Sequence, residues 1–119
     1  MQYLGALTEK LQGYLGPEQV NAVRRAYFYS EQAHDGQVRR TGQPYVTHPL
    51  AVAGILAELK LDEASVVTGL LHDTIEDTLA TREEIDAIFG DEIADLVDGV
   101  TKLSQFSAAN TQEEKQAEN

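Results

Sequence analysis

An apolar stretch that ends in an imidazole and three carboxylates constrains this chain more than any other feature. The helical spacing places four of its residues on one face: Val66, Leu70, Asp73 and Asp77. Two carboxylates therefore continue a stripe that is expected to point into the core. A buried carboxylate needs a cation, hydrogen-bond donors or a proton, because its unpaired charge is costly there. With His72 beside Asp73 and Glu76 one turn further on, the stretch is a candidate metal site with an acid–base pair attached.

The connectivity is expected to bring a second histidine to this stretch. His48 is followed by a proline and an apolar run, and proline is favoured at the first position of a helix. The link at 60–62 to the next helix is short, so the two helices should be antiparallel neighbours. His48 would then lie near His72 and Asp73. The alternative stays open from these residues alone: His72 is a core histidine, and the carboxylates cap helices.

The spacing of apolar residues predicts an all-α fold of about six helices. They are expected at residues 3–14, 17–34, 49–59, 62–77, 82–89 and 91–104, with at most a short hairpin within 37–46. Asp62 is a predicted N-cap, and Thr81 with Glu84 is a predicted capping box. Residues 106–119 are polar, which predicts a flexible tail or the start of a further helix.

Composition argues against several functional classes. The 119 residues carry a net charge of −11, with +1 on residues 1–60 and −12 on residues 61–119. This balance argues against broad nucleic-acid binding, which needs a basic surface. The absence of cysteine excludes disulfides and thiolate metal sites within these residues. No long apolar run or signal pattern is present, so we expect a cytoplasmic protein without membrane contact.

Several motifs in colinear order resemble the N-terminal hydrolase domain of RelA/SpoT-type proteins, especially the bifunctional SpoT-like enzymes. The resemblance covers roughly residues 10–105 and rests on these segments: Ala33-His34-Asp35-Gly36-Gln37, Arg39-Arg40-Thr41-Gly42-Gln43-Pro44-Tyr45, His48-Pro49, His72-Asp73-Thr74-Ile75-Glu76-Asp77 and Val97-Asp98-Gly99-Val100-Thr101-Lys102-Leu103. The family belongs to the HD superfamily of helical, metal-dependent phosphohydrolases. The resemblance implies removal of the 3′ pyrophosphate from guanosine tetra- and pentaphosphate, the alarmones of the stringent response, usually with Mn²⁺.

The resemblance also implies a role for each matching residue at the site. His48, His72 and Asp73 match three metal ligands of the family. Glu76 and Asp77 match the acidic pair that positions or activates the attacking water. This assignment agrees with the chemistry, since a metal held by imidazoles and a carboxylate can activate water and polarise a phosphoryl oxygen.

Nucleotide contacts are implied for the loop that precedes His48. Arg39 matches the residue that stacks on the guanine, with Arg40 and Thr41 beside it. The family completes its metal site with an aspartate in a later motif similar to L-A-D-R-x-H-N, and this sequence contains no match to that motif. We therefore expect residues 1–105 to be a partial HD phosphohydrolase domain from the front of a longer protein. One Mn²⁺ would be held without the fourth protein ligand.

Three functions remain open on the sequence alone. The first is the N-terminal part of an alarmone 3′-pyrophosphohydrolase, and the second is an HD phosphohydrolase acting on another nucleotide. The third is a helical fragment that has lost the chemistry. A partial domain would expose apolar surface, and a large exposed patch is unusual on a monomer. We therefore expect a homodimer, or else marginal stability.

Overall fold

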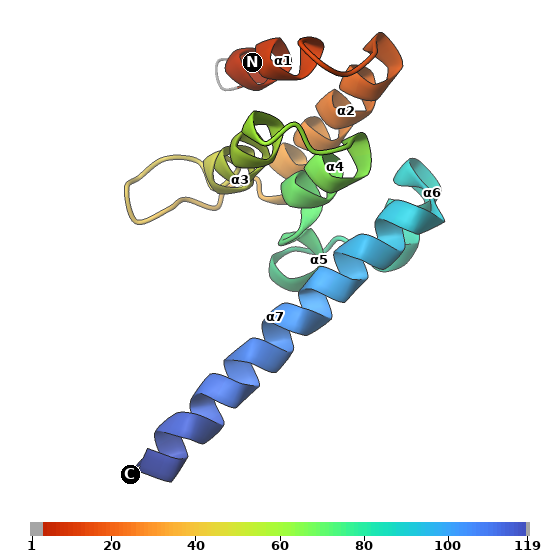
Figure 1. The fold of residues 1–119 in the computed structure, drawn as a ribbon. Coiled ribbons are helices and arrows are strands. Elements are labelled where there is room, and N and C mark those ends of the chain that lie inside the picture. The colour runs from red at the N-terminus through yellow and green to blue at the C-terminus, as the bar shows by residue number, and fades with distance from the viewer. Residues whose placement is uncertain (1–3, 119) are drawn as a thin grey trace.

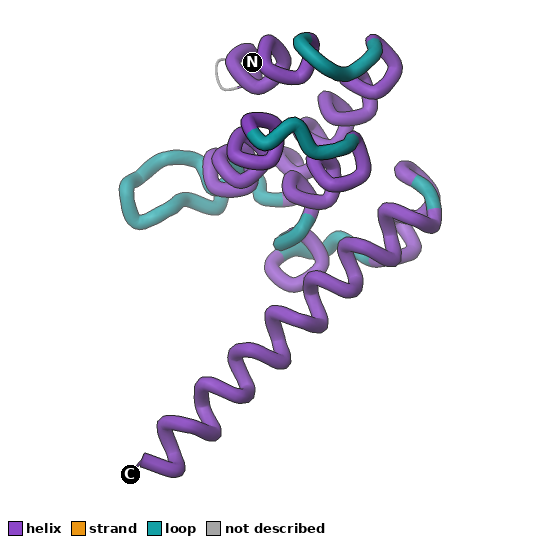
Figure 2. The backbone as a smooth tube through the Cα atoms, viewed as in Figure 1, coloured by secondary structure: helices purple, strands orange, loops and turns teal. Residues whose placement is uncertain are grey.

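The structure of the protein is a computed structural model that describes the backbone of residues 4–118 and the side chains of residues 4–104. Regular structure in this part of the chain is entirely helical (Figures 1 and 2). The seven helices are α1 (Leu4–Gln12), α2 (Pro17–Ala33), α3 (Thr47–Glu58), α4 (Glu63–Leu71), α5 (Thr74–Asp77), α6 (Arg82–Phe89) and α7 (Asp91–Glu118). The all-α prediction is confirmed. The expected helix start at residue 3 lies outside the described residues.

The core lies where α4 packs against both α2 and α3. Val66, Leu70 and Leu71 of α4 are fully buried. Tyr27 of α2 is buried against them in the same cluster. α1 covers α2 and α3, while α6 packs on α7, which in turn contacts α4 and α5. The described helices include none that is long and apolar enough to cross a membrane.

The helix expected at 62–77 is two helices in the structure. Asp62 caps α4 as predicted, since its Oδ1 accepts a hydrogen bond from Ser65 N at 3.1 Å. The helix then ends because side chains take the carbonyls of its last turn. The Thr74 hydroxyl donates to Leu71 O at 2.8 Å, and the His72 ring lies 2.6 Å from Gly69 O. Such local side-chain bonds compete with the helical backbone ladder.

This break corrects the prediction that two carboxylates continue the buried stripe. Asp73 takes φ −97° and ψ −6° ahead of the one-turn α5, and its side chain is partly buried. Asp77 is exposed. The prediction assumed one continuous helix through residues 62–77. The turn at 72–73 interrupts this helix, so the residues after it no longer follow the same face.

The last helix is longer than predicted. It was expected to end at residue 104, but α7 continues to Glu118 and projects away from the other helices (Figure 1). Residues 105–118 contain neither glycine nor proline and include several good helix formers, so polarity alone does not end the helix. Thr81 caps α6 as predicted, with Glu84 N donating to Thr81 Oγ1 at 3.2 Å, but the predicted capping box is incomplete, because the Glu84 carboxylate accepts a hydrogen bond from Tyr29 instead of from the backbone of Thr81.

The longest loop joins α2 to α3 (Figure 2). The hairpin expected at 37–46 is reduced to one antiparallel bridge between Val38 and Pro44. Its turn closes through Arg39 N, which donates to Gln43 O at 2.9 Å, and Gly42 has φ +86°. A second left-handed glycine, Gly36 with φ +82°, turns the chain back toward the core directly after α2.

Candidate metal centre

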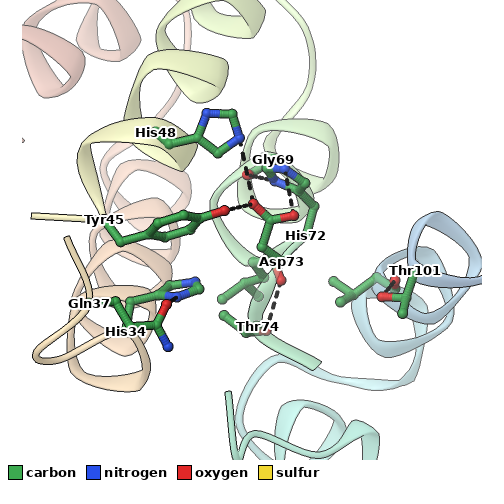
Figure 3. Close-up of polar contacts among 11 residues, drawn as sticks. His34, Gln37, Tyr45, His48, Gly69, His72, Asp73, Thr74 and Thr101 are labelled. Carbon is green, nitrogen blue, oxygen red and sulfur yellow. Dashed lines mark hydrogen bonds and ion pairs between the residues drawn. The ribbon is translucent and has the colours of Figure 1, made fainter. Parts of the chain in front are cut away.

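Two histidines and one aspartate meet where the start of α3 faces the end of α4 (Figure 3). His48 lies in the first turn of α3, while His72 and Asp73 form the link between α4 and α5. The Nε2 atom of His48 is 3.5 Å from Asp73 Oδ2, and the Nε2 atom of His72 is 3.1 Å from Asp73 Oδ1. One ligand atom from each residue lies within 4.8 Å of the others. The structure therefore brings the three predicted ligand residues together.

A hydrogen bond fixes the tautomer of His72. Its Nδ1 lies 2.6 Å from Gly69 O, and a carbonyl oxygen can accept but not donate. Nδ1 therefore carries a proton, and Nε2 of the neutral ring points its lone pair at the Asp73 carboxylate. A lone pair and an anion repel each other unless a cation or a proton lies between them. Metal-binding histidines are oriented by the same type of bond to a backbone carbonyl.

Tyr45 holds the other oxygen of the aspartate. Its hydroxyl donates to Asp73 Oδ2 at 2.9 Å, and its ring packs between the rings of His34 and His48 (Figure 3). Burial, followed by this hydrogen bond and the charge of Asp73, raises the pKa of the Tyr45 hydroxyl. Tyr45 therefore stays a donor. Its place in the motif before His48 gave no indication of this contact.

Without a metal, His72 and Asp73 behave as a proton-sharing pair. The hydrogen bond with Asp73 raises the pKa of the His72 imidazole, against the effect of burial. Burial raises the pKa of Asp73, but the hydrogen bonds from His72 and Tyr45 outweigh it, and the net pKa is lowered. The raised pKa of His72 and the lowered pKa of Asp73 both favour a protonated, positively charged His72 beside an ionised Asp73. A divalent ion bound to the same atoms would take the place of the proton.

The acidic pair predicted for catalysis lies outside the group of three. Glu76 and Asp77 are both exposed on α5, the single turn that follows Asp73. The charge of Asp77 makes a small contribution to the raised pKa of His72, behind the hydrogen bond with Asp73. Asp77 is therefore near enough for its charge to act on His72. The carboxylate of Glu76 has no ion pair or hydrogen bond within the described side chains.

The three residues predicted for nucleotide contact lie on the loop before α3. Arg39 is half-buried and its Nη1 donates to Thr47 Oγ1 at 3.3 Å, next to His48 in the chain. The positive charge of Arg39 partly opposes the burial that raises the pKa of Tyr45, which places it close to the site. Arg40 and Thr41 are exposed and carry no hydrogen bond to the metal-binding group.

Comparisons with known proteins identify the family of this chain. Residues 26–119 match the family described as HD domain. A GTP pyrophosphokinase of Myxococcus xanthus is 67% identical over 102 residues, which make up 84% of this chain and 14% of that protein. The bifunctional (p)ppGpp synthase/hydrolase SpoT of Escherichia coli K12 is 45% identical over 119 residues, 100% of this chain and 17% of that protein.

A solved structure, reported as a metazoan ortholog of SpoT that hydrolyses ppGpp and plays a role in starvation responses, has a similar fold. It matches with a TM-score of 0.65 and 32% identity over 74% of this chain and 49% of its own. The chain belongs to the HD domain family and, within it, to the N-terminal HD domains of RelA/SpoT-type proteins. It spans 14% and 17% of the length of the two curated relatives described above.

Proposed function

We propose that this chain forms the metal-holding N-terminal part of a guanosine-3′,5′-bis(diphosphate) 3′-pyrophosphohydrolase. The observation that carries the proposal is the convergence of His48, His72 and Asp73, with His72 oriented by Gly69 O, in an HD domain. A relative from Escherichia coli O157:H7 that is named for this activity is 45% identical over 119 residues, which supports the choice of substrate.

The donor atoms fit a divalent cation, and we propose one Mn²⁺. Two imidazole nitrogens and a carboxylate oxygen suit Mn²⁺, although the same set also accepts other first-row metals. When bound, such an ion would lower the pKa of a coordinated water molecule, and the ion would polarise a phosphoryl oxygen. Three protein ligands are fewer than the four that the family resemblance implies, so we expect weak metal binding by residues 1–119 alone.

The acidic pair is proposed to handle the proton of the attacking water. Asp77 and Glu76 are exposed on α5, which begins immediately after the ligand Asp73, so a substrate at the site can reach both carboxylates. A carboxylate within hydrogen-bond reach can accept a proton as the water oxygen attacks phosphorus. The bond from that phosphorus to the 3′ oxygen breaks, and a proton passes to the 3′ oxygen.

Guanine recognition is proposed for the loop before α3. The Arg39 guanidinium lies at the edge of the site and can stack on a base, with Arg40 and Thr41 exposed beside it. An HD phosphohydrolase for another nucleotide would share the metal group but would not need Arg39. Replacement of this residue therefore tests the base and not the metal chemistry.

Pyrophosphate release tests the proposal. Residues 1–119 would replace the matching 119 residues in the Escherichia coli SpoT protein. Hydrolysis of guanosine tetraphosphate by this exchanged protein would be measured with Mn²⁺. We expect activity in the exchanged protein, its loss with His72→Ala, and a large loss with Arg39→Ala. Arg25→Ala, on the exposed face of α2, is the matched control and should retain activity. The assignment would be refuted if the exchanged protein released no pyrophosphate while the unaltered SpoT protein was active in the same assay.

A further inference from the structure

The side chain of Gln37 connects the end of α2 to the end of α5. Its Nε2 donates to the backbone oxygen of Asp77 at 3.0 Å, and its Oε1 lies 3.0 Å from Nδ1 of His34. Because a carbonyl oxygen only accepts, the amide must present its NH₂ group to Asp77. Oε1 then faces His34, so Nδ1 of that ring must carry a proton. His34 is 3% exposed, and its ring packs against Tyr45 at 4.5 Å between centroids (Figure 3).

α5 needs such external support because it is a single turn. Its backbone bonds include those from Asp77 N to Asp73 O and from Thr78 N to Thr74 O, each at 3.0 Å. A helix this short is unstable on its own, and its last carbonyls have no helical partner. Gln37 supplies a donor to the carbonyl of Asp77. At the other end of the turn, Tyr45 donates to the Asp73 carboxylate.

The backbone of Gln37 is itself held on both sides. Its N–H donates to His34 O at 3.0 Å, and its carbonyl accepts from Tyr45 N at 2.9 Å. The left-handed Gly36 lets the chain reverse directly before it. Gln37 and Tyr45 are therefore tied together by their main chains while their side chains contact the two ends of α5.

We propose that Gln37 is a positioning residue that, with Tyr45, clamps α5 in a fixed orientation beside the metal-binding group. This inference rests on the proposed function, because the orientation of α5 matters for catalysis only if Glu76 and Asp77 act on the attacking water. The hydrogen bonds of Gln37 go to His34, Tyr45 and Asp77 and not to the predicted metal ligands. Gln37 acts through the backbone of Asp77 and through the His34 ring that supports Tyr45.

Two substitutions separate the contacts of Gln37. Gln37→Met keeps the length of the side chain but removes both hydrogen bonds. Gln37→Glu keeps an acceptor for His34 and removes the donor to Asp77. Gln32→Met is the matched control, because Gln32 is exposed on α2 and its side chain makes no hydrogen bond within the described residues.

Amide hydrogen exchange and the His34 tautomer provide readouts that need neither metal nor turnover. Loss of one hydrogen bond is expected to speed exchange of the Asp77 and Thr78 amides by roughly five- to tenfold in both Gln37 variants. The ¹⁵N shifts of His34 should report the Nδ1–H tautomer in the parent chain and in Gln37→Glu. This signature should be lost in Gln37→Met, and Gln32→Met should change neither readout.

Unchanged exchange at Asp77 and Thr78 in both Gln37 variants would overturn the proposal, as would equal acceleration in Gln32→Met. A Mn²⁺ titration by electron paramagnetic resonance, with the metal alone as probe, then separates it from the proposed function. A parent chain that binds no Mn²⁺ would count against the metal site. The exchange results would still decide whether Gln37 clamps α5, because they are measured without metal.

Discussion

Both ring nitrogens of His72 have partners that suit a metal ligand: a backbone carbonyl orients the ring, and a carboxylate lies beside the nitrogen that would bind the metal. Nδ1 donates to Gly69 O, and Nε2 faces Asp73 Oδ1 at 3.1 Å. In the metal-free chain a proton on Nε2 satisfies the carboxylate, and in the metal-bound chain the cation does. Proton and metal therefore compete for one position, and the two states should respond to pH in opposite directions.

The contribution of His72 and Asp73 to metal-free stability should be largest in mildly acidic solution. The raised pKa of His72 contributes stability below its ordinary value of 6.5, and this stability is lost as the pH rises through the raised value. The lowered pKa of Asp73 contributes above its ordinary value of 3.8, and this is lost as the pH falls through the lowered value. The pair is fully charged between these limits, where we expect it to add on the order of 1 kcal/mol.

Thermal unfolding with a chelator present checks this window. The difference in unfolding free energy between the parent chain and His72→Ala should be largest between about pH 4 and 6.5 and should shrink above neutrality. A difference that stays constant or grows toward alkaline pH would show that His72 and Asp73 do not share a proton. With saturating Mn²⁺, the stabilisation should instead increase with pH.

Tyr45→Phe should weaken metal binding without unfolding the protein. The substitution removes the hydroxyl that donates to Asp73 Oδ2 and keeps the ring against His34. Loss of such an outer contact typically costs about ten- to a hundredfold in metal affinity. Tyr29→Phe is the control, because the Tyr29 hydroxyl bonds Glu84 away from the site. Equal Mn²⁺ affinities in the two variants, by calorimetry, would contradict the role of Tyr45.

The sequence predicted which residues would converge but not how they are held. His48 could be placed near His72 because two helices with a short link must be antiparallel neighbours. Tyr45 and Gln37 could not be found in this way. Their partners lie 28 and 40 residues away, and loop geometry decides which side chain reaches them. Asp77 was wrongly expected to be buried because the turn at 72–73 interrupts the helical period.

At the scale of elements, the contact between α3 and α4 sets the separation of the two histidines. Gly69 lies in this contact, where an added Cβ atom would lie 2.7 Å from Cδ1 at the end of the Leu56 side chain, which would have to shift, and 3.5 Å from Val52 Cγ1. The helices approach closely at the end that carries the site. Six helix positions could be predicted from apolar spacing, whereas the division at His72 depends on side-chain bonds that compete with the backbone.

Gly69→Val should therefore destabilise the fold and disturb the site together. Overpacking at such a contact costs about 1–3 kcal/mol, and it should also lower Mn²⁺ affinity by moving α3 away from α4. Gly54→Val is the matched control on α3, because an added Cβ atom there meets nothing within 4 Å. Chemical denaturation measures both variants. The assignment of the contact fails if Gly54→Val is as destabilising as Gly69→Val.

At the scale of the whole molecule, α7 carries an exposed apolar stripe. Leu96, Val100 and Leu103 are spaced by four and three residues and are all exposed, on a helix that extends away from the core (Figure 1). Two copies of such a helix can bury their stripes against each other. The net charge of −11 opposes this contact, but repulsion is screened beyond about 8 Å at physiological ionic strength. The homodimer expected from the sequence stays a prediction.

Sedimentation equilibrium tests that dimer. We expect concentration-dependent association in the parent chain and about a tenfold or greater weakening with Leu103→Glu, because a charge would enter the apolar contact. Leu79→Glu is the control, since Leu79 is 98% exposed on the loop between α5 and α6. A monomer at all concentrations, or equal weakening by both substitutions, would contradict association through α7.

The central claim is that His48, His72 and Asp73 hold one ion, and pulsed electron paramagnetic resonance of the Mn²⁺-loaded chain tests it most directly. The ¹⁴N couplings of two imidazoles should appear, because one nitrogen of each histidine lies in the 4.8 Å group. His48→Ala and His72→Ala should each remove one of the two couplings. Bound Mn²⁺ without nitrogen coupling, or with couplings unchanged in both variants, would contradict the site.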